Sequence, residues 1–162
     1  MEATRDPVHR SRYAFQRDGE NMVVETWIEP RGILPEHLHP RQVEHWSVLE
    51  GEIRFGLAGE KRQLRPSDGE VIVEPGTKHS LENTGDTETH LRCYAIPALG
   101  LEGFLTESAA AARDGMFMRG GIPRSLRGAR WAARFLKQYE NDVVISFPPR
   151  LIQRAMIALL AR

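Results

Sequence analysis

Hydrophobic and polar side chains alternate along most of residues 7–96, and this pattern predicts a series of short β-strands. The clearest alternations cover residues 22–28, 44–49, 53–57, 70–74 and 89–96. Turn-forming pairs such as Asp18-Gly19, Glu50-Gly51 and Pro75-Gly76 separate them, at intervals of about ten residues. Because no helical periodicity lies between the strands, the pattern favours an antiparallel sandwich or barrel over alternating βαβ units.

After Pro97 the hydrophobic period becomes helical. We predict one helix from Leu101 to Arg113 and a second that Ser125 caps and that runs to about Tyr139. Pro148-Pro149 precedes a third predicted helix. We expect the apolar stripe of this helix to be buried against protein; the stripe comprises Leu151, Ile152, Met156, Leu159 and Leu160. The chain then divides into a β-domain over residues 1–98 and a helical extension over residues 99–162, which packs on the β-domain or on a dimer partner.

Four side chains in the β-region are of the types that bind transition metals. His37 and His39 alternate along an extended segment and therefore face the same side. Glu44 follows after a gap long enough for the chain to turn back, and His79 stands just after the Pro75-Gly76 turn. Three neutral imidazoles and one carboxylate suit iron, manganese, nickel, copper or zinc. We expect one such divalent ion, and the sequence leaves its identity open.

These residues resemble the two motifs of the cupin superfamily. Gly32 to Gly51 is similar to the first motif, and Gly69 to Asn83 is similar to the second, so that the motif region spans residues 32–83. Four rather than five residues separate Gly32 from His37, and Glu74 stands where the family often has proline. The resemblance implies a mainly β double-stranded β-helix (jelly-roll) barrel with C-terminal α-helices, whose metal ligands His37, His39, Glu44 and His79 point into its mouth.

Strand alternation also predicts the wall of a pocket. If Glu44 faces inward, Trp46 and Val48 on the same strand face inward too. Phe55 lies on the next strand, and Leu81 shares the face of His79. We expect Trp46, Phe55 and Leu81 to line the pocket. Val48, Ile53 and Leu57 are expected in the core. Such a wall suits a small, partly hydrophobic organic ligand.

Composition narrows the class of protein. The chain has 162 residues, of which 41% are hydrophobic, so it can bury the core of one domain. Cys93 is its single cysteine, which excludes a disulfide framework and indicates a reducing compartment. It has no apolar run of about 18 residues and no secretory signal pattern, and we therefore expect a cytoplasmic location.

Charge is unevenly distributed along the chain. Residues 1–112 hold 12 Lys and Arg against 19 Asp and Glu, whereas residues 113–162 hold 10 against 3. The basic segment either packs on the acidic half of this chain or of a partner, or it serves as an adaptor for a membrane or a nucleic acid. We favour the first alternative because the segment also has apolar faces to bury, and expect no nucleic-acid partner and no membrane.

Three functional hypotheses follow. The first is a metal-dependent enzyme for a small organic molecule, with dioxygenase, isomerase and cyclase chemistry all compatible. The second is a ligand-binding or structural cupin without turnover, and the third is the adaptor just described. A homodimer is expected through the early strand around Tyr13–Arg17, because an open sandwich leaves edge strands that pair readily.

Overall fold

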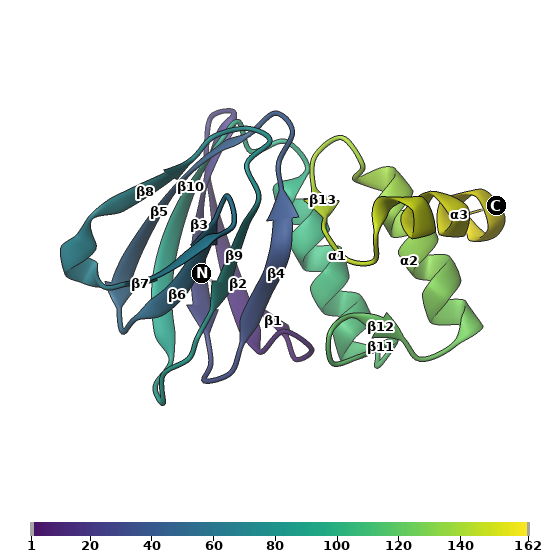
Figure 1. The fold of residues 1–162 in the computed structure, drawn as a ribbon, viewed down its shortest axis with the longest axis horizontal. Coiled ribbons are helices and arrows are strands. Elements are labelled where there is room, and N and C mark those ends of the chain that lie inside the picture. Colours follow the sequence, from purple (N-terminus) through teal and green to yellow (C-terminus); the bar gives the residue numbers. More distant parts are fainter. Residues whose placement is uncertain (1, 162) are drawn as a thin grey trace.

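The computed structural model describes residues 2–161 and consists of two facing antiparallel β-sheets with helices on one side (Figure 1). The six-stranded sheet has, in spatial order, β1 (Thr4–Asp6), β2 (Ser11–Asp18), β3 (Asn21–Ile28), β10 (Thr89–Ile96), β5 (Val43–Glu50) and β8 (Glu70–Val73). The five-stranded sheet has β13 (Val144–Ile145), β4 (Ile33–Leu38), β9 (His79–Glu82), β6 (Ile53–Leu57) and β7 (Glu60–Leu64). This arrangement confirms the mainly β, two-sheet cupin fold with C-terminal helices.

The hydrophobic core fills the space between the two sheets. Alternate residues of the central strands point inward, so β3 and β10 each show a strict alternation of buried and less buried positions. Met22, Ile28, Ile53, Leu81 and Leu91 are completely buried there. Strand periodicity alone was therefore enough to predict this core, because odd and even positions along a strand face opposite sides of the sheet.

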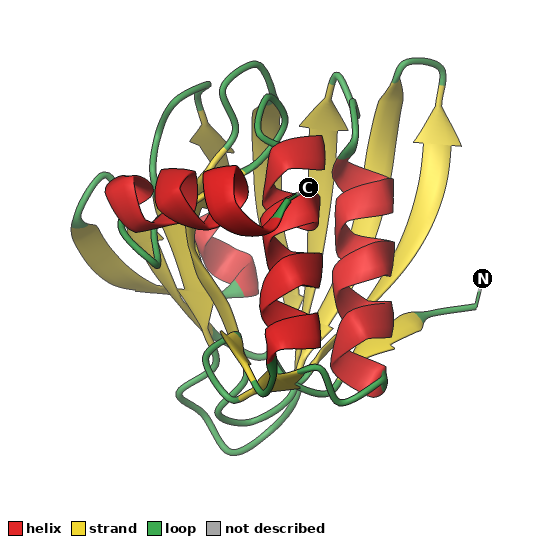
Figure 2. Cartoon of the chain, turned by 90° about the vertical axis from the view of Figure 1, so that its right-hand side faces the viewer, coloured by secondary structure: helices red, strands yellow, loops and turns green. Residues whose placement is uncertain are grey.

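Three helices follow the β-domain and cover one open side of it (Figure 2). They are α1 (Leu101–Arg113), α2 (Leu126–Gln138) and α3 (Arg150–Leu160), and a small hairpin of β11 (Phe117–Met118) and β12 (Ile122–Pro123) joins the first two. A single 3₁₀ turn, η1 (Pro66–Asp68), precedes β8. The bounds of α1 agree with the sequence prediction, and the Ser125 hydroxyl caps α2 by accepting the Gly128 N–H at 3.2 Å.

Aromatic side chains hold α1 and α2 together. The rings of Phe104 and Phe135 lie 4.8 Å apart, and Tyr139 contacts both of them. The Tyr139 hydroxyl donates to Glu107 at 2.8 Å, and burial together with this bond raises the pKa of Tyr139 to about 12. A Cβ at Gly103 would lie only 2.5 Å from the Tyr139 hydroxyl, so the absence of a side chain there permits the close approach.

The extension is attached to the β-domain at its beginning and near its end. The buried Gln42 side chain donates to the carbonyls of Pro97 and Ala98, at 2.6 and 3.0 Å, and so fixes the last residues of the β-domain, just before the extension. Near its end, β13 pairs with β4, so that Ile145 lies opposite His37 in the five-stranded sheet. The segment between α2 and α3 is therefore part of the sheet that carries a candidate ligand.

The expectation that the stripe of the third helix is buried is wrong for the single chain. Leu151, Ile152 and Leu159 are 81%, 51% and 75% exposed. The helix instead turns Gln153 inward, whose amide donates to the carbonyls of Ile145 and Pro148 at 2.9 and 2.6 Å. These two bonds fix the rotation of α3 about its axis and leave the apolar stripe largely on the surface.

Within the single chain, the expected charge complementarity does not extend to Arg127 and Arg130. Arg127 and Arg130 are exposed and form no ion pair with any residue between 2 and 161. Ion pairs between the two parts of the chain include Arg17 with Glu102 and Arg41 with Asp142, and in both the arginine belongs to the β-domain. Helix α2 packs through its aromatic and aliphatic face, which leaves these two arginines toward solvent.

The oligomeric state remains a prediction. Strand β1 pairs with only Ser11–Tyr13 of β2, so residues 14–18 of β2 form a free edge that can pair with another chain. Within the described part of the chain, no helix has the length and apolar character required to cross a membrane.

The Gln153 side chain gives a test of how α3 is attached. Gln153→Ala leaves two carbonyls without their donor, and we expect a loss of about 1–3 kcal/mol in the free energy of unfolding. The measurement is urea denaturation followed by circular dichroism. Arg154→Ala, on the exposed side of the same helix, is the matched control and should change this energy by less than about 0.5 kcal/mol. Equal stability of both variants would contradict the role assigned to Gln153.

Candidate metal centre

His37 and His79 are cross-strand neighbours in the five-stranded sheet. They lie directly opposite each other in the pairing of β4 with β9, and their ring centroids are 4.2 Å apart. A register shift in β4 between Leu34 and His37 interrupts the ladder just before this pair. Irregularities of this kind re-aim side chains near functional sites.

His39 joins this pair from the turn that follows β4. Its backbone carbonyl accepts the Gly76 N–H at 2.8 Å, and Gly76 has a φ of 78°, in the left-handed region that favours glycine. The turn that precedes His79 is thereby tied to the turn that carries His39. The ligand nitrogens of His37, His39 and His79 all lie within 4.8 Å of one another.

Each of the three imidazoles is held by a backbone carbonyl through Nδ1. His37 Nδ1 donates to Pro35 O at 2.8 Å, His39 Nδ1 to Asp142 O at 3.0 Å, and His79 Nδ1 to Thr77 O at 3.2 Å. A carbonyl oxygen only accepts hydrogen bonds, so Nδ1 carries the proton and Nε2 presents a lone pair. This orientation of the ring is the one found in histidines that ligate metals through Nε2.

Glu44 brings a carboxylate to the same point from the opposite sheet. Its oxygens lie 3.2 Å from His39 Nε2 and 2.9 Å from His79 Nε2, and its Oε2 accepts the indole N–H of Trp46 at 2.9 Å. The Nε2 atoms of His39 and His79 are buried and have no hydrogen-bond partner among the described residues. The Nε2 lone pairs of these two histidines thus face the Glu44 carboxylate with no proton donor between them. A cation at this point would interact favourably with the lone pairs and with the carboxylate. The donor set therefore fits a divalent transition metal.

Burial sets the protonation of these groups. It lowers the pKa of His37 well below the usual 6.5 and also lowers the pKa of His39. Burial opposes the charged form of Glu44, but in acidic solution the imidazoles of His39 and His79 take up the proton first, and their positive charge holds the pKa of the carboxyl below its ordinary value. Two neutral imidazoles and a carboxylate are the forms that bind a metal ion.

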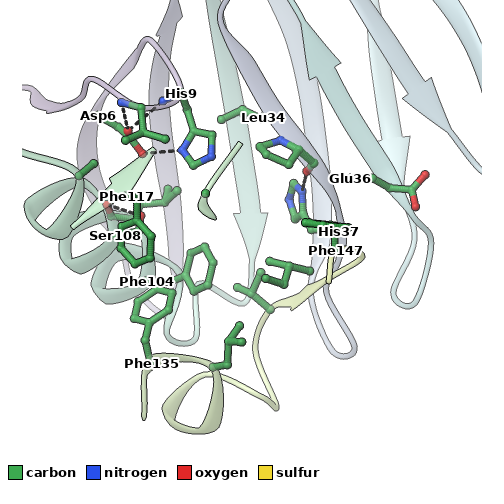
Figure 3. Close-up of a pocket in the computed structure, with 18 of the residues that line it drawn as sticks. Asp6, His9, Leu34, Glu36, His37, Phe104, Ser108, Phe117, Phe135 and Phe147 are labelled. Atoms are coloured by element: carbon green, nitrogen blue, oxygen red, sulfur yellow. Dashed lines mark hydrogen bonds and ion pairs between the residues drawn. The ribbon is translucent and has the colours of Figure 1, made fainter. Parts of the chain in front are cut away.

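Two histidines of the cluster, His37 and His39, border a cavity of about 500 Å³ between the β-domain and the helices, and Glu44 also lines it (Figure 3). Strands β2, β3, β4 and β5 supply one side of it, and the three helices and the 143–148 segment supply the other. The helical part of the lining is apolar or aromatic and includes Phe104, Leu105, Phe135, Leu136 and Met156. Figure 3 shows His37 on one side of this space and Phe104 and Phe135 on another.

The residues expected to line the pocket have different positions in the structure. Trp46 lines the cavity, and its side chain is 6% exposed. Phe55 and Leu81 are instead completely packed in the core, where the Phe55 ring lies parallel to the His79 ring with centroids 6.4 Å apart. They support the floor of the site and do not face the open space.

Sequence reasoning missed part of the site. The Asp142 carbonyl that holds His39 comes from a segment 103 residues away, and a backbone acceptor leaves no mark in the side-chain pattern. The spacing of Phe104, Leu105 and Ser108 on one face of a helix was a signal for the second wall of the cavity. Cys93 lies on the cavity lining next to Glu44, and burial raises the pKa of its thiol well above the usual value, as expected for an unreactive core cysteine.

Comparison with known proteins adds the family. Residues 17–96 match the model of the cupin domain family. The chain is 30% identical over 95 residues to an oxidoreductase of Arthrobotrys oligospora. This match covers 55% of this chain and 38% of that protein. It is 37% identical over 90 residues to a germin-like protein of Oryza sativa subsp. japonica (53% and 39%), and 34% identical over 64 residues to an oxidoreductase of Penicillium terrestre (40% and 25%). The chain thus spans less than two-fifths of the length of these relatives.

Solved structures support the fold. A cupin domain of Schizosaccharomyces pombe superposes with a TM-score of 0.53 at 16% identity, covering 71% of this chain and 75% of that one. An RmlC-like cupin of Shewanella frigidimarina superposes with a TM-score of 0.53 at 23% identity, covering 60% and 85%. At these levels of identity the likeness concerns the fold alone.

The geometry makes metal binding directly testable. His79→Ala removes one of three converging nitrogens, and we expect the affinity for Zn²⁺ or Mn²⁺ to fall by more than about 100-fold, since loss of an outer-shell partner alone costs 10–100-fold. Isothermal titration of the metal-stripped protein measures this change. His45→Ala is the matched control, because His45 lies on the same strand as Glu44 but pairs with Glu70 outside the site. Wild-type affinity in His79→Ala would contradict the assignment.

The metal affinity should also depend on pH in a defined way. A metal ion binds neutral imidazole, and burial lowers the pKa values of His37 and His39. Affinity should therefore stay constant from pH 8 down to the usual histidine pKa of 6.5, and decline only in more acidic solution. Titrations at fixed ionic strength between pH 5 and 8 test this expectation. A steady loss of affinity already between pH 8 and 6.5 would show that these imidazoles are protonated at ordinary pH.

Proposed function

Residues 17–96 belong to the cupin family, and from this premise we propose that the chain is a metal-dependent oxidoreductase that acts on a small, largely apolar organic molecule. The oxidoreductase class draws support from the two fungal relatives that bear this name. Both relatives extend well beyond the region shared with this chain, so this class of activity enters as part of the proposal.

The observation that carries the proposal is the convergence of three imidazole lone pairs and a carboxylate beside a largely apolar cavity. A structural role for this cluster would be costly, because buried lone pairs without donors lose the hydrogen bonds that they make with water. A bound divalent ion removes that cost. An adjacent cavity of about 500 Å³ gives the ion access to a ligand of moderate size.

In this proposal His37, His39, His79 and Glu44 hold one iron, manganese, nickel, copper or zinc ion. When bound, the metal supplies Lewis-acid or redox chemistry. Glu44 is fixed by the Trp46 indole N–H, so its carboxylate keeps one orientation. Trp46 also closes the wall beside the ligands, and together with the apolar helices it excludes water from the reacting end of the substrate.

The helices define the substrate class. Phe104, Leu105 and Phe135 offer flat apolar surfaces to the body of a molecule whose oxygen-bearing end reaches the metal centre. The C-terminal segment contributes to both the cavity and the metal centre. It forms part of the cavity wall, and its Asp142 carbonyl orients His39.

The proposal is tested with protein loaded with Fe²⁺ or Mn²⁺ under anaerobic conditions and then exposed to air-saturated buffer. Oxygen uptake is measured with an electrode over a panel of small apolar alcohols, phenols and hydroxyketones, and products are identified by mass spectrometry. We expect uptake and an oxidised product for at least one compound of the panel. His79→Ala should reduce the rate by more than about 100-fold, and His45→Ala should retain it.

A second outcome would favour the non-catalytic alternative. If panel compounds bind to the metal-loaded protein but neither oxygen uptake nor any product exceeds the His79→Ala background, the chain is a ligand-binding cupin and the oxidoreductase proposal is wrong. Turnover that is equal in His79→Ala would likewise contradict it, because the reaction would then not depend on the metal centre.

A further inference from the structure

A second polar group borders the same cavity, away from the three-histidine cluster. Asp6 ends β1, and its side chain is only 2% exposed. Its Oδ1 accepts the backbone N–H groups of Val8 and His9, at 2.9 and 3.0 Å, and these bonds shape the turn into β2. Its Oδ2 accepts the Nδ1–H of His9 at 2.8 Å. The turn itself needs only the first oxygen, so the second has the separate effect of orienting the His9 ring.

This orientation determines what His9 offers to the cavity. Because the Asp6 carboxylate accepts the proton on Nδ1, the Nε2 atom of neutral His9 presents a lone pair. No residue in the described part of the chain forms a hydrogen bond with that atom. His9 is part of the cavity lining, and Figure 3 shows its ring and that of His37 on opposite sides of the space. A fixed acceptor therefore stands in a wall that is otherwise largely apolar.

The distance between His9 and the metal-binding histidine His37 follows from the backbone. The carbonyl of His9 accepts the N–H of Ile33, the first residue of β4, at 3.0 Å. His37 lies four residues further along this strand, and the residues of β9 opposite Ile33 and His37 are three apart, which corresponds to roughly 10–13 Å at 3.3 Å per residue. Leu34, on the cavity lining, lies between the two histidines along the chain. The cavity thus combines a metal-binding end, an apolar middle and an acceptor end.

We propose that His9 is the second substrate-binding group of this cavity and that Asp6 is its positioning residue. The pair recognises a hydrogen-bond donor, a hydroxyl or an ammonium group, on a substrate whose opposite end bears the oxygen atoms that reach the metal. The substrate is accordingly an elongated molecule with an apolar body and polar groups at both ends. This inference rests on the proposed function, because it takes the metal centre as the other anchor.

The test uses synthetic probes with a hydroxamate at one end, which binds Zn²⁺ through two oxygens. A linear chain of six to ten methylene groups follows, and the other end is a hydroxyl, an ammonium, a methoxy or a methyl group. Dissociation constants are measured by isothermal titration of the probes into the Zn²⁺-loaded protein. At the best chain length we expect the hydroxyl or the ammonium probe to bind about tenfold or more tightly than the methoxy probe, which accepts but does not donate. The stronger of the two identifies the donor.

Two variants separate recognition from structure. His9→Phe keeps an aromatic ring but removes the acceptor, so the preference for a donor should disappear. In Asp6→Asn the amide oxygen still accepts the turn N–H groups, while its NH₂ donates to Nδ1 and forces the proton of His9 onto Nε2. The preference over the methoxy probe should then vanish or reverse. Zn²⁺ affinity and thermal stability are measured in parallel, and His45→Phe serves as the control, since its own carboxylate partner, Glu70, lies outside the cavity.

The outcomes are distinguishable. Equal binding of the hydroxyl, ammonium and methoxy probes at every length by wild-type protein overturns the role of His9 and leaves the metal centre in place. A donor preference that survives in both His9→Phe and Asp6→Asn overturns it as well. If the Zn²⁺-loaded protein binds none of the hydroxamates, the proposed function fails and the inference fails with it.

Discussion

The pairing of β13 with β4 is the constraint on which the site depends. It places the Asp142 carbonyl at Nδ1 of His39, and it directs the chain from α2 back across the opening of the β-domain. The same segment supplies Val143, Ile145 and Phe147 to the cavity lining. One short strand therefore links the orientation of a candidate ligand to the closure of the cavity, so a change that detaches it affects both.

The chemistry of the centre follows from an excess of acceptors. Three imidazoles use their single proton on backbone carbonyls, and the Glu44 carboxylate adds two more acceptor oxygens. In water such groups are hydrated, but here the apolar core and the cavity wall replace water. A cation would compensate these lone pairs, so the buried Nε2 atoms without a hydrogen-bond partner are consistent with a metal ion at this point.

The helical extension has a role different from the one that its charge suggests. Its net positive charge suggests a surface that binds the acidic half, yet Arg127 and Arg130 face solvent. The contacts that join the extension to the β-domain instead include the β13–β4 pairing and the ion pairs in which β-domain arginines meet Glu102 and Asp142. The extension then provides the apolar half of the cavity, which the β-domain alone lacks.

The sequence by itself determined the secondary-structure elements and the candidate ligands that the structure brings together. A period of two places Met22, Trp46 and Leu81 on inner faces whatever the overall topology, and the spacing of His37, His39, Glu44 and His79 depends only on local turns and the motif resemblance. Tertiary structure decided the remainder. The Asp142 carbonyl is a backbone group without a side-chain signature, and His9 faces the cavity only because Asp6 and Ile33 fix its turn. The exposed stripe of α3 was also decided there, because hydrogen bonds from one glutamine set the rotation of the helix and outweighed its apolar pattern.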